Sequence, residues 1–318
     1  MLDVALYVCP QTVCSSLSMA GDAFLLANQL AGQALFRVRR FSLDGQPVEL
    51  GFATIRVDGG LEIAEQAGLV LIPATGSAIA RVLATNATLL TWLEGRPATQ
   101  QLASLCSSAF ILAAAGLLDG RRATTHWSLA EPFRRYFPRV RLDIDELLTH
   151  DGHLLCSGGA QAGLDLCLYL IGQHGGDWLA QQVASALVFD TRRGRQSRFA
   201  PLLPEPAVQE GPLASLLHWL QKHHAEPLDL HRLAEQAHCS PRTLLRRFKA
   251  GTGLTPNEYL QRLRIESARI ALRNPATSLE QVAAQVGYAD RATFAKLFKQ
   301  LCGETPGAFR RRLREAKA

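Results

Sequence analysis

The fold is decided by the stretch VAAQVGYADRATFAKLFKQLCGETPGAFR, residues 282–310, because much of it occurs a second time upstream. Residues 248–264 match it when moved forward by 50 positions, and further upstream the offset becomes 49. The matched pairs are Phe248-Lys249 with Phe298-Lys299, Gly253 with Gly303, Thr255-Pro256 with Thr305-Pro306, Tyr259 with Phe309, Leu263-Arg264 with Leu313-Arg314, and Leu233-Ala234 with Val282-Ala283. We interpret this as a duplicated unit of about 50 residues, with too few copies for a solenoid.

Each copy predicts a helix, a tight turn, a second helix and then a longer helix. In the second copy, Ser278 and Gln281 form a capping box that begins a helix, and Gly287 supplies the left-handed residue that ends it. The next helix is expected from about Asp290 to Gln300. In the first copy His238 stands in place of this glycine, which predicts some loss of local stability.

The second helix of each copy is predicted to carry an exposed basic stripe. A helix–turn–helix presents this face to the major groove, where Arg reaches two acceptors of guanine and Lys reaches bases or phosphates. A solvated charged face is the alternative for any one stripe, but two matching stripes favour DNA. The stripe residues are Arg242, Leu245, Arg246 and Lys249 in the first copy and Arg291, Ala292, Ala295, Lys296 and Lys299 in the second.

The charge distribution supports a polyanionic partner for the C-terminal part of the chain. Residues 201–318 carry 18 basic and 11 acidic side chains, whereas residues 1–200 carry 16 and 17. Between the copies, Thr255-Pro256-Asn257-Glu258 begins a helix that we expect to run to about Arg273, a length of roughly 28 Å. A spacer of this size would set the two reading helices about one turn of DNA apart, roughly 34 Å.

Residues 213–316 resemble the DNA-binding domain of AraC/XylS-type regulators. The resemblance implies regulation of transcription at a promoter, with RNA polymerase as a partner; activation is expected, and repression stays open. It also implies that the base-facing positions are Arg242, Leu245 and Arg246 in the first unit and Arg291, Ala292, Ala295 and Lys296 in the second. The arginines near the C-terminus (Arg310, Arg311, Arg312 and Arg314) suit phosphate contact and a favourable helix end equally well.

The front half predicts an α/β domain with a flavodoxin-like, parallel-sheet sandwich. Residues 4–8 and 69–73 are apolar runs typical of parallel strands buried on both faces, and helices are expected at 160–174 and 177–189. Further strands are expected at 37–43, 52–57, 101–106 and 123–126, with a hairpin turn at 150–153. The predicted domains are therefore a sensor at 1–190, a proline-containing linker at 191–212 and an all-α domain with two helix–turn–helix motifs at 213–318.

The cysteines and the apolar segments indicate a reducing compartment. Seven cysteines form an odd count without the spacing of a metal site, so we expect free thiols, no metal and no cofactor. The first 36 residues contain no Lys or Arg, and the apolar stretch 102–118 contains three serines. These features predict a cytoplasmic protein without a membrane partner.

The segment LASLCSSAFILAAAGLLDG, residues 102–120, predicts a strand, a sharp turn at Cys106 and a helix, an arrangement that lowers a thiol's pKa. With RRATTHW after it, this segment resembles the ThiJ/PfpI branch of the class I glutamine-amidotransferase-like superfamily. The later SGGAQAGLDLCLYL and TRRGRQSRF resemble GlxA-type regulators, which join such a domain to an AraC-type domain. This resemblance covers nearly the whole chain and implies a domain that is mostly a sensor.

The catalytic pattern of the ThiJ/PfpI enzymes is altered here, so we predict no catalytic residue and no enzyme. Ser18 stands where those enzymes place an acid, with Asp22 as a substitute one turn on. Ser107 rather than His follows Cys106, and the oxyanion segment reads Pro73-Ala74-Thr75-Gly76. The alternative is a Cys106-dependent hydrolase or glyoxalase fused to a DNA-binding domain.

The same cleft suits a small-molecule effector in the sensor interpretation, because open α/β sheets bind ligands over their strand ends. Polar groups there suit a polar or anionic head group, while Trp127 or Phe110 would cover an apolar or cationic part. The resemblance implies an amino-acid- or amine-derived metabolite, and we expect a homodimer. The candidate ligand-binding residues are Thr75, Gly76, Cys106, Ser107, Ser108, His126 and Trp127.

Overall fold

The computed structural model describes residues 1–191, 193–199, 202–203 and 211–315. The chain forms two compact units, Met1–Ser197 and Arg198–Ala318, and each is considered by itself. Their boundary falls inside the segment 191–212 that the sequence suggests as a linker. Among the described residues, no helix has the length and apolarity needed to span a bilayer.

The first unit is built on a six-stranded sheet in the order β2-β1-β5-β6-β10-β9. Every neighbouring pair is parallel except β10 with β9, which form an antiparallel hairpin around Gly152 (φ +66°). The predicted hairpin turn and mostly parallel, flavodoxin-like sheet are therefore confirmed. The strands are β1 Leu2–Tyr7, β2 Phe36–Phe41, β5 Leu69–Ile72, β6 Gln101–Leu105, β9 Leu148–Asp151 and β10 Leu154–Ser157.

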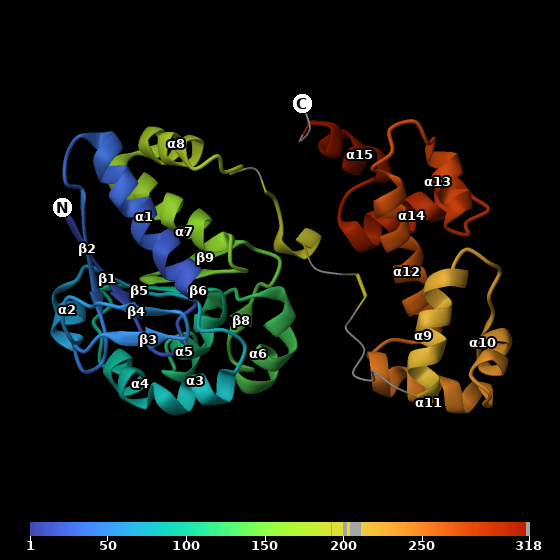
Figure 1. The fold of residues 1–318 in the computed structure, drawn as a ribbon, viewed down its shortest axis with the longest axis horizontal. Coiled ribbons are helices and arrows are strands. Elements are labelled where there is room, and N and C mark those ends of the chain that lie inside the picture. Colours follow the sequence, from blue (N-terminus) through green and yellow to red (C-terminus); the bar gives the residue numbers. More distant parts are fainter. Residues whose placement is uncertain (192, 200–201, 204–210, 316–318) are drawn as a thin grey trace. The chain divides into compact units, whose positions relative to one another are not determined.

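Helices cover both faces of this sheet (Figure 1). In β1, Val4 and Leu6 pack into the cluster on one face and Ala5 and Tyr7 into the cluster on the other, which explains the continuous apolar run. One face carries α1 Cys14–Ala31, α7 Ala162–Gly175 and α8 Asp177–Ala186. The other carries α2 Leu61–Gln66, α3 Ile79–Thr85, α4 Ala87–Glu94, α5 Ala109–Ala114 and α6 Ala130–Tyr136.

Two of the predicted strands lie outside the main sheet. β4 (Ala53–Ile55) pairs only with β3 (Val48–Leu50). The strand expected at 123–126 was wrong in extent, since β7 covers Arg122–Ala123 and pairs with β8 (Arg141–Leu142). The hydroxyls of Thr124 and Thr125 instead donate to distant carbonyls, and the chain turns into a short 3-10 helix at Trp127–Leu129.

The second unit repeats one geometry twice. α10 and α13 have 7 residues each, and α11 and α14 have 12 each. Phe248 meets Tyr259 edge-on with ring centroids 5.4 Å apart, and Phe298 meets Phe309 in the same way at 5.5 Å. The helices are α9 Pro212–His223, α10 Leu230–Gln236, α11 Pro241–Thr252, α12 Pro256–Ala271, α13 Leu279–Gln285, α14 Arg291–Cys302 and α15 Pro306–Glu315.

The long helix α12 belongs to the cores of both copies. Tyr259, Leu260 and Leu263 pack into the first cluster, and Ile265 and Ala268 into the second. The capping box predicted at its start is present, but the helix ends at Ala271, two residues earlier than expected. Its 16 residues span about 24 Å. One rigid element therefore joins the two helix–turn–helix motifs.

Candidate DNA interface and sensor cleft

The helix α11 separates an apolar side from a charged side. Leu244 and Phe248 are buried in the core of the first copy, whereas Arg242, Arg246 and Lys249 are exposed. Leu245, between the charges, is 40% exposed and offers a methyl-bearing contact within a basic stripe. This is the arrangement that a reading helix requires, since the face away from the core stays accessible.

The helix α14 repeats the arrangement with one added constraint. Phe294 and Phe298 are fully buried, while Arg291, Ala292, Lys296 and Lys299 are exposed and Ala295 is half-buried. Arg291 forms an exposed ion pair with Glu280 of α13. A base contact by Arg291 would therefore compete with a carboxylate on the preceding helix.

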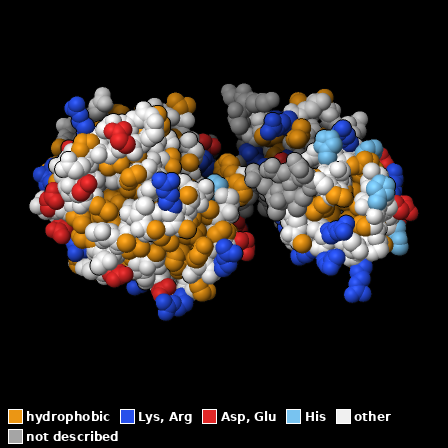
Figure 2. Space-filling model, turned by 60° about the horizontal axis from the view of Figure 1, so that its bottom comes forward, with side chains coloured by type: hydrophobic (Ala, Val, Ile, Leu, Met, Phe, Trp, Pro, Cys, Tyr) orange, Lys and Arg blue, Asp and Glu red, His pale blue; other side chains and the backbone are white. Residues whose placement is uncertain are grey.

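The other charges of the two stripes are available to a ligand. Of the ion pairs found in the described part of the second unit, none involves Arg242, Arg246, Lys249, Lys296 or Lys299. Figure 2 shows acidic and basic side chains mixed over the first unit, while basic and histidine side chains predominate on the visible face of the second. Unpaired cations on an exposed face favour contact with phosphates and bases.

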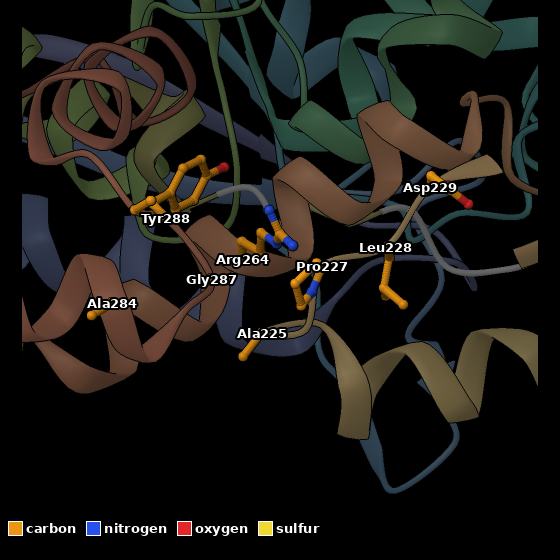
Figure 3. A pocket seen from close by; sticks show the side chains of 9 residues that line it. Ala225, Pro227, Leu228, Asp229, Arg264, Ala284, Gly287 and Tyr288 are labelled. Carbon is orange, nitrogen blue, oxygen red and sulfur yellow. The ribbon is translucent and has the colours of Figure 1, made fainter. Parts of the chain in front are cut away.

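The joint between the two copies contains residues that sequence reasoning missed. Arg264 of α12 donates to the carbonyls of His224 (2.7 Å) and Glu226 (2.8 Å) in the α9–α10 loop. Its guanidinium lies 5.4 Å from the ring of Tyr288, which follows α13. Figure 3 shows Arg264 between these two segments, in a pocket of about 640 Å³. The only sequence signal was the repeated Leu-Arg pair of the duplicated unit.

Gly287 completes this joint because its backbone approaches the α9–α10 loop closely. Its φ is +87°, and a Cβ atom here would lie 2.6 Å from the carbonyl oxygen of Ala225. Glycine is required twice over, for its left-handed conformation and for the contact. The turn of the second motif is thereby fixed against the loop that precedes the first.

The sharp turn predicted at Cys106 is present in the first unit. β6 ends at Leu105, Cys106 has φ +58°, and a helical segment follows at once. A non-glycine residue in this region stores backbone strain, which is typical of functional turns. The expected lowering of the thiol's pKa was wrong, because burial raises the pKa of Cys106 and the Ser107 N–H offsets this only in part.

Among the described residues, no acidic or basic side chain contributes to the shift in the pKa of Cys106. Burial raises this pKa and the Ser107 backbone lowers it in part. Ser18 and Asp22 are exposed, and the Ser18 hydroxyl donates to the Cys14 carbonyl within its own helix. Burial lowers the pKa of His126, whose Nδ1 lies 2.7 Å from the Ser128 hydroxyl.

The other candidate ligand residues divide into structural and accessible groups. The Ser107 hydroxyl accepts from the Thr75 amide (3.0 Å), and the Ser108 hydroxyl donates to the Ile72 carbonyl (2.7 Å). Both serines are buried, and their hydroxyls connect the turn after β6 to the end of β5. The Thr75 Oγ1 atom, in contrast, is buried without a hydrogen-bond partner. Gly76 is exposed, and His126 and Trp127 are half-buried with ring centroids 4.9 Å apart.

Comparison with known proteins gives a matching family model for each of the two units. The DJ-1/PfpI family model matches residues 22–173, and a helix-turn-helix domain model matches residues 233–312. The HTH-type transcriptional regulator CdhR of Pseudomonas aeruginosa is 30% identical over 274 residues, which cover 86% of this chain and 81% of CdhR. The chain belongs to the GlxA-type branch of the AraC/XylS-family HTH transcriptional regulators.

Two further comparisons extend this assignment. The HTH-type transcriptional regulator GbdR of Pseudomonas aeruginosa strain UCBPP-PA14 is 28% identical over 299 residues, covering 92% of this chain and 79% of GbdR. A solved structure of a putative transcriptional regulator from Vibrio parahaemolyticus covers 58% of this chain and 98% of its own, with a TM-score of 0.52 and 18% identity. At that identity the structural likeness concerns the fold of the first unit alone.

Proposed function

We propose that this regulator binds double-stranded promoter DNA sequence-specifically by placing α11 and α14 in successive major grooves. The observation that carries the proposal is the duplication of an exposed basic stripe on two helices of equal length, joined by one rigid helix. Both stripes stand on the side opposite to a buried aromatic core. Docking of such helices in the major groove is the usual mode of helix–turn–helix proteins.

The test uses the full chain and a duplex selected from a randomised pool. Arg246→Ala should weaken binding to the selected duplex by about 1–3 kcal/mol, whereas Arg247→Ala, which removes a charge from another face of α11, should affect it much less. The affinity of the wild-type chain for this duplex should fall steeply as the salt concentration rises. Equal losses in the two variants would contradict the assigned reading face.

We also propose that the first unit is a sensor that binds an amino-acid- or amine-derived metabolite at the Cys106 turn. The unpartnered Thr75 hydroxyl supports this, because a buried polar atom without a partner is costly unless a ligand satisfies it. In this proposal the exposed Gly76 and the half-buried His126 and Trp127 would contact the metabolite, beside Cys106 and the buried Ser107 and Ser108.

A thermal-shift screen of amines and amino acids against the full chain tests this sensor role. Thr75→Val keeps the side-chain shape and removes only the hydroxyl. It should abolish the shift given by a hit without lowering the melting temperature of the free protein. A hit that stabilises both forms equally would place the ligand elsewhere.

Activation of transcription together with RNA polymerase, and action as a homodimer, complete the proposal. Two chains suit paired operator sites. In vitro transcription with a selected promoter distinguishes activation from repression. Sedimentation of the full chain gives its oligomeric state.

A thiol enzyme is the second candidate, favoured by the strained backbone of Cys106. We infer that the protein is not an enzyme, because a catalytic thiolate needs a base or a positive partner and burial raises the pKa of this thiol. Turnover of a glyoxal or amide substrate that is lost in Cys106→Ser would reverse this inference.

A further inference from the structure

Gln196 is a buried side chain in the segment that leads from the first unit to the second. It is only 2% exposed, although it lies within the TRRGRQSRF stretch, where arginines and polar residues predominate. Burying a carboxamide is unfavourable unless all its donors and acceptors are satisfied. The groups that form hydrogen bonds to Gln196 therefore identify the part of the first unit that this segment contacts.

The carboxamide of Gln196 makes four hydrogen bonds, all to backbone groups. Its Nε2 donates to the carbonyls of Ile144 (2.8 Å) and Thr125 (2.9 Å). Its Oε1 accepts from the amides of Gly159 (2.8 Å) and Trp127 (3.2 Å). Two carbonyls and two amides thus converge on one carboxamide, which fulfils its full hydrogen-bonding capacity.

Two adjacent glycines make room for this arrangement. A Cβ atom on Gly158 would lie 2.7 Å from Gln196 Oε1, and one on Gly159 would lie 2.9 Å from Cδ2 of His126. Neither glycine has a positive φ, so space rather than conformation explains them. The two glycines directly after β10 are consequently part of the receptor for the Gln196 side chain.

The receptor shares residues with the proposed effector cleft. Thr125 connects the two, because its carbonyl accepts from Gln196 while its hydroxyl donates to the carbonyl of Cys106 (2.9 Å). Trp127, a candidate wall of the cleft, holds Gln196 through its amide. A second anchor lies three residues earlier, where Arg193 pairs with Asp165 of α7 and stacks on Phe189 at 4.6 Å.

We propose that the backbone groups of residues 125, 127, 144 and 159 form a carboxamide-binding site whose intramolecular ligand is Gln196, and that this site ties the segment leading to the DNA-binding unit to the effector cleft. A molecule that moves Trp127 or Thr125 then changes the hold on that segment. This last consequence rests on the proposed sensor function, whereas the site itself does not.

Trypsin cleavage after Arg195 in the full chain tests the site without effector or DNA. The bond precedes Gln196, so its cleavage requires the segment to leave its receptor. Cleavage, normalised to the unfolded chain, should be at least about tenfold faster in Gln196→Ala and in Gly158→Ala, which leaves the cleaved sequence unchanged. Gly21→Ala, whose Cβ would make an ordinary 3.7 Å contact with Leu6, is the control and should cleave at the wild-type rate.

The double variant makes the test specific. If Gly158→Ala acts by expelling the Gln196 side chain, it should add nothing in the Gln196→Ala background, so the double variant should match Gln196→Ala within about twofold. Circular dichroism and binding to a selected duplex show that each variant is folded. Wild-type cleavage in Gln196→Ala, or multiplying effects in the double variant, would overturn the proposal, while a failed metabolite screen would overturn only the sensor function.

Discussion

Gly287→Ala is the substitution that probes the joint between the two helix–turn–helix motifs most directly. The new methyl group would lie 2.6 Å from the Ala225 carbonyl oxygen and 3.0 Å from two further backbone atoms of Ala225. Non-bonded carbon contacts are favourable only from about 3.5 Å, so the joint must open by roughly 1 Å. The left-handed φ of +87° adds a conformational cost of about 1–2 kcal/mol.

The chain offers a control with the same conformation and no clash. Gly303, at the end of α14, has φ +75°, and a Cβ atom added there would have no neighbour within 4 Å. Gly303→Ala should therefore cost about 1–2 kcal/mol. Gly287→Ala should cost about 2–5 kcal/mol, since overpacking against backbone adds about 1–3 kcal/mol.

Hydrogen exchange of peptides from residues 212–315 in the full chain measures this difference, because local opening free energies report each motif separately. The same variants are then compared on duplexes in which the two half-sites are separated by different numbers of base pairs. Gly287→Ala should lose its preference for one spacing, and Gly303→Ala should keep it. Equal exchange and equal spacing preference in both variants would refute the role of the Gly287–Ala225 contact.

Three further outcomes follow from local electrostatics. Glu280→Gln releases Arg291 from its ion pair, so duplex affinity should rise and the salt dependence should steepen by about one counterion; an unchanged slope in a salt titration would count against contact by Arg291. Hydrogen bonds from Thr293 and the start of α14 lower the pKa of Asp290, so its stabilisation is complete above its unfolded pKa of about 4 and is lost as pH falls through its folded value. In Asp290→Asn, the melting temperature should therefore fall less between about pH 5 and pH 2 than it does in the wild-type protein. Because burial raises the pKa of Cys106, alkylation by iodoacetamide should be slow at neutral pH and accelerate only above the ordinary thiol pKa of about 8.5; fast, pH-independent labelling would indicate a thiolate.

The second unit could be derived from its sequence because its local signals agree with each other. The capping box at Ser278, the glycine after α13 and the aromatic spacing all predicted the same helices, and the structure reproduces them in both copies. His238 takes the positive φ (+49°) that its position in the duplicated turn requires. A fold can be predicted from a single sequence when its capping residues, turn residues and core spacing agree in this way.

In the first unit the sequence predicted the sheet well, whereas it predicted the contacts around the Cys106 turn less well. Apolar runs in the sequence identify the buried strands. Thr124 and Thr125 also have the composition of a strand, but their hydroxyls form hydrogen bonds to distant backbone carbonyls. Gln196 had no local signal, because a polar residue among arginines and prolines is typical of an exposed linker. Its partners lie 37 to 71 positions away and contribute only backbone groups, which no side-chain pattern can indicate.

Two tightly packed connections in the described part of the molecule depend on a glycine in the same way. At Gly287 the missing side chain allows a turn to reach the backbone of Ala225, and at Gly158 it allows a carboxamide to enter a ring of backbone groups. In each case a methyl group would displace the partner, so an alanine there acts on the position of a whole segment. Substitutions at these glycines should therefore change the preferred spacing of the DNA half-sites and the hold on the linker segment, while leaving the proposed base-contacting residues Arg242, Arg246 and Lys296 chemically intact.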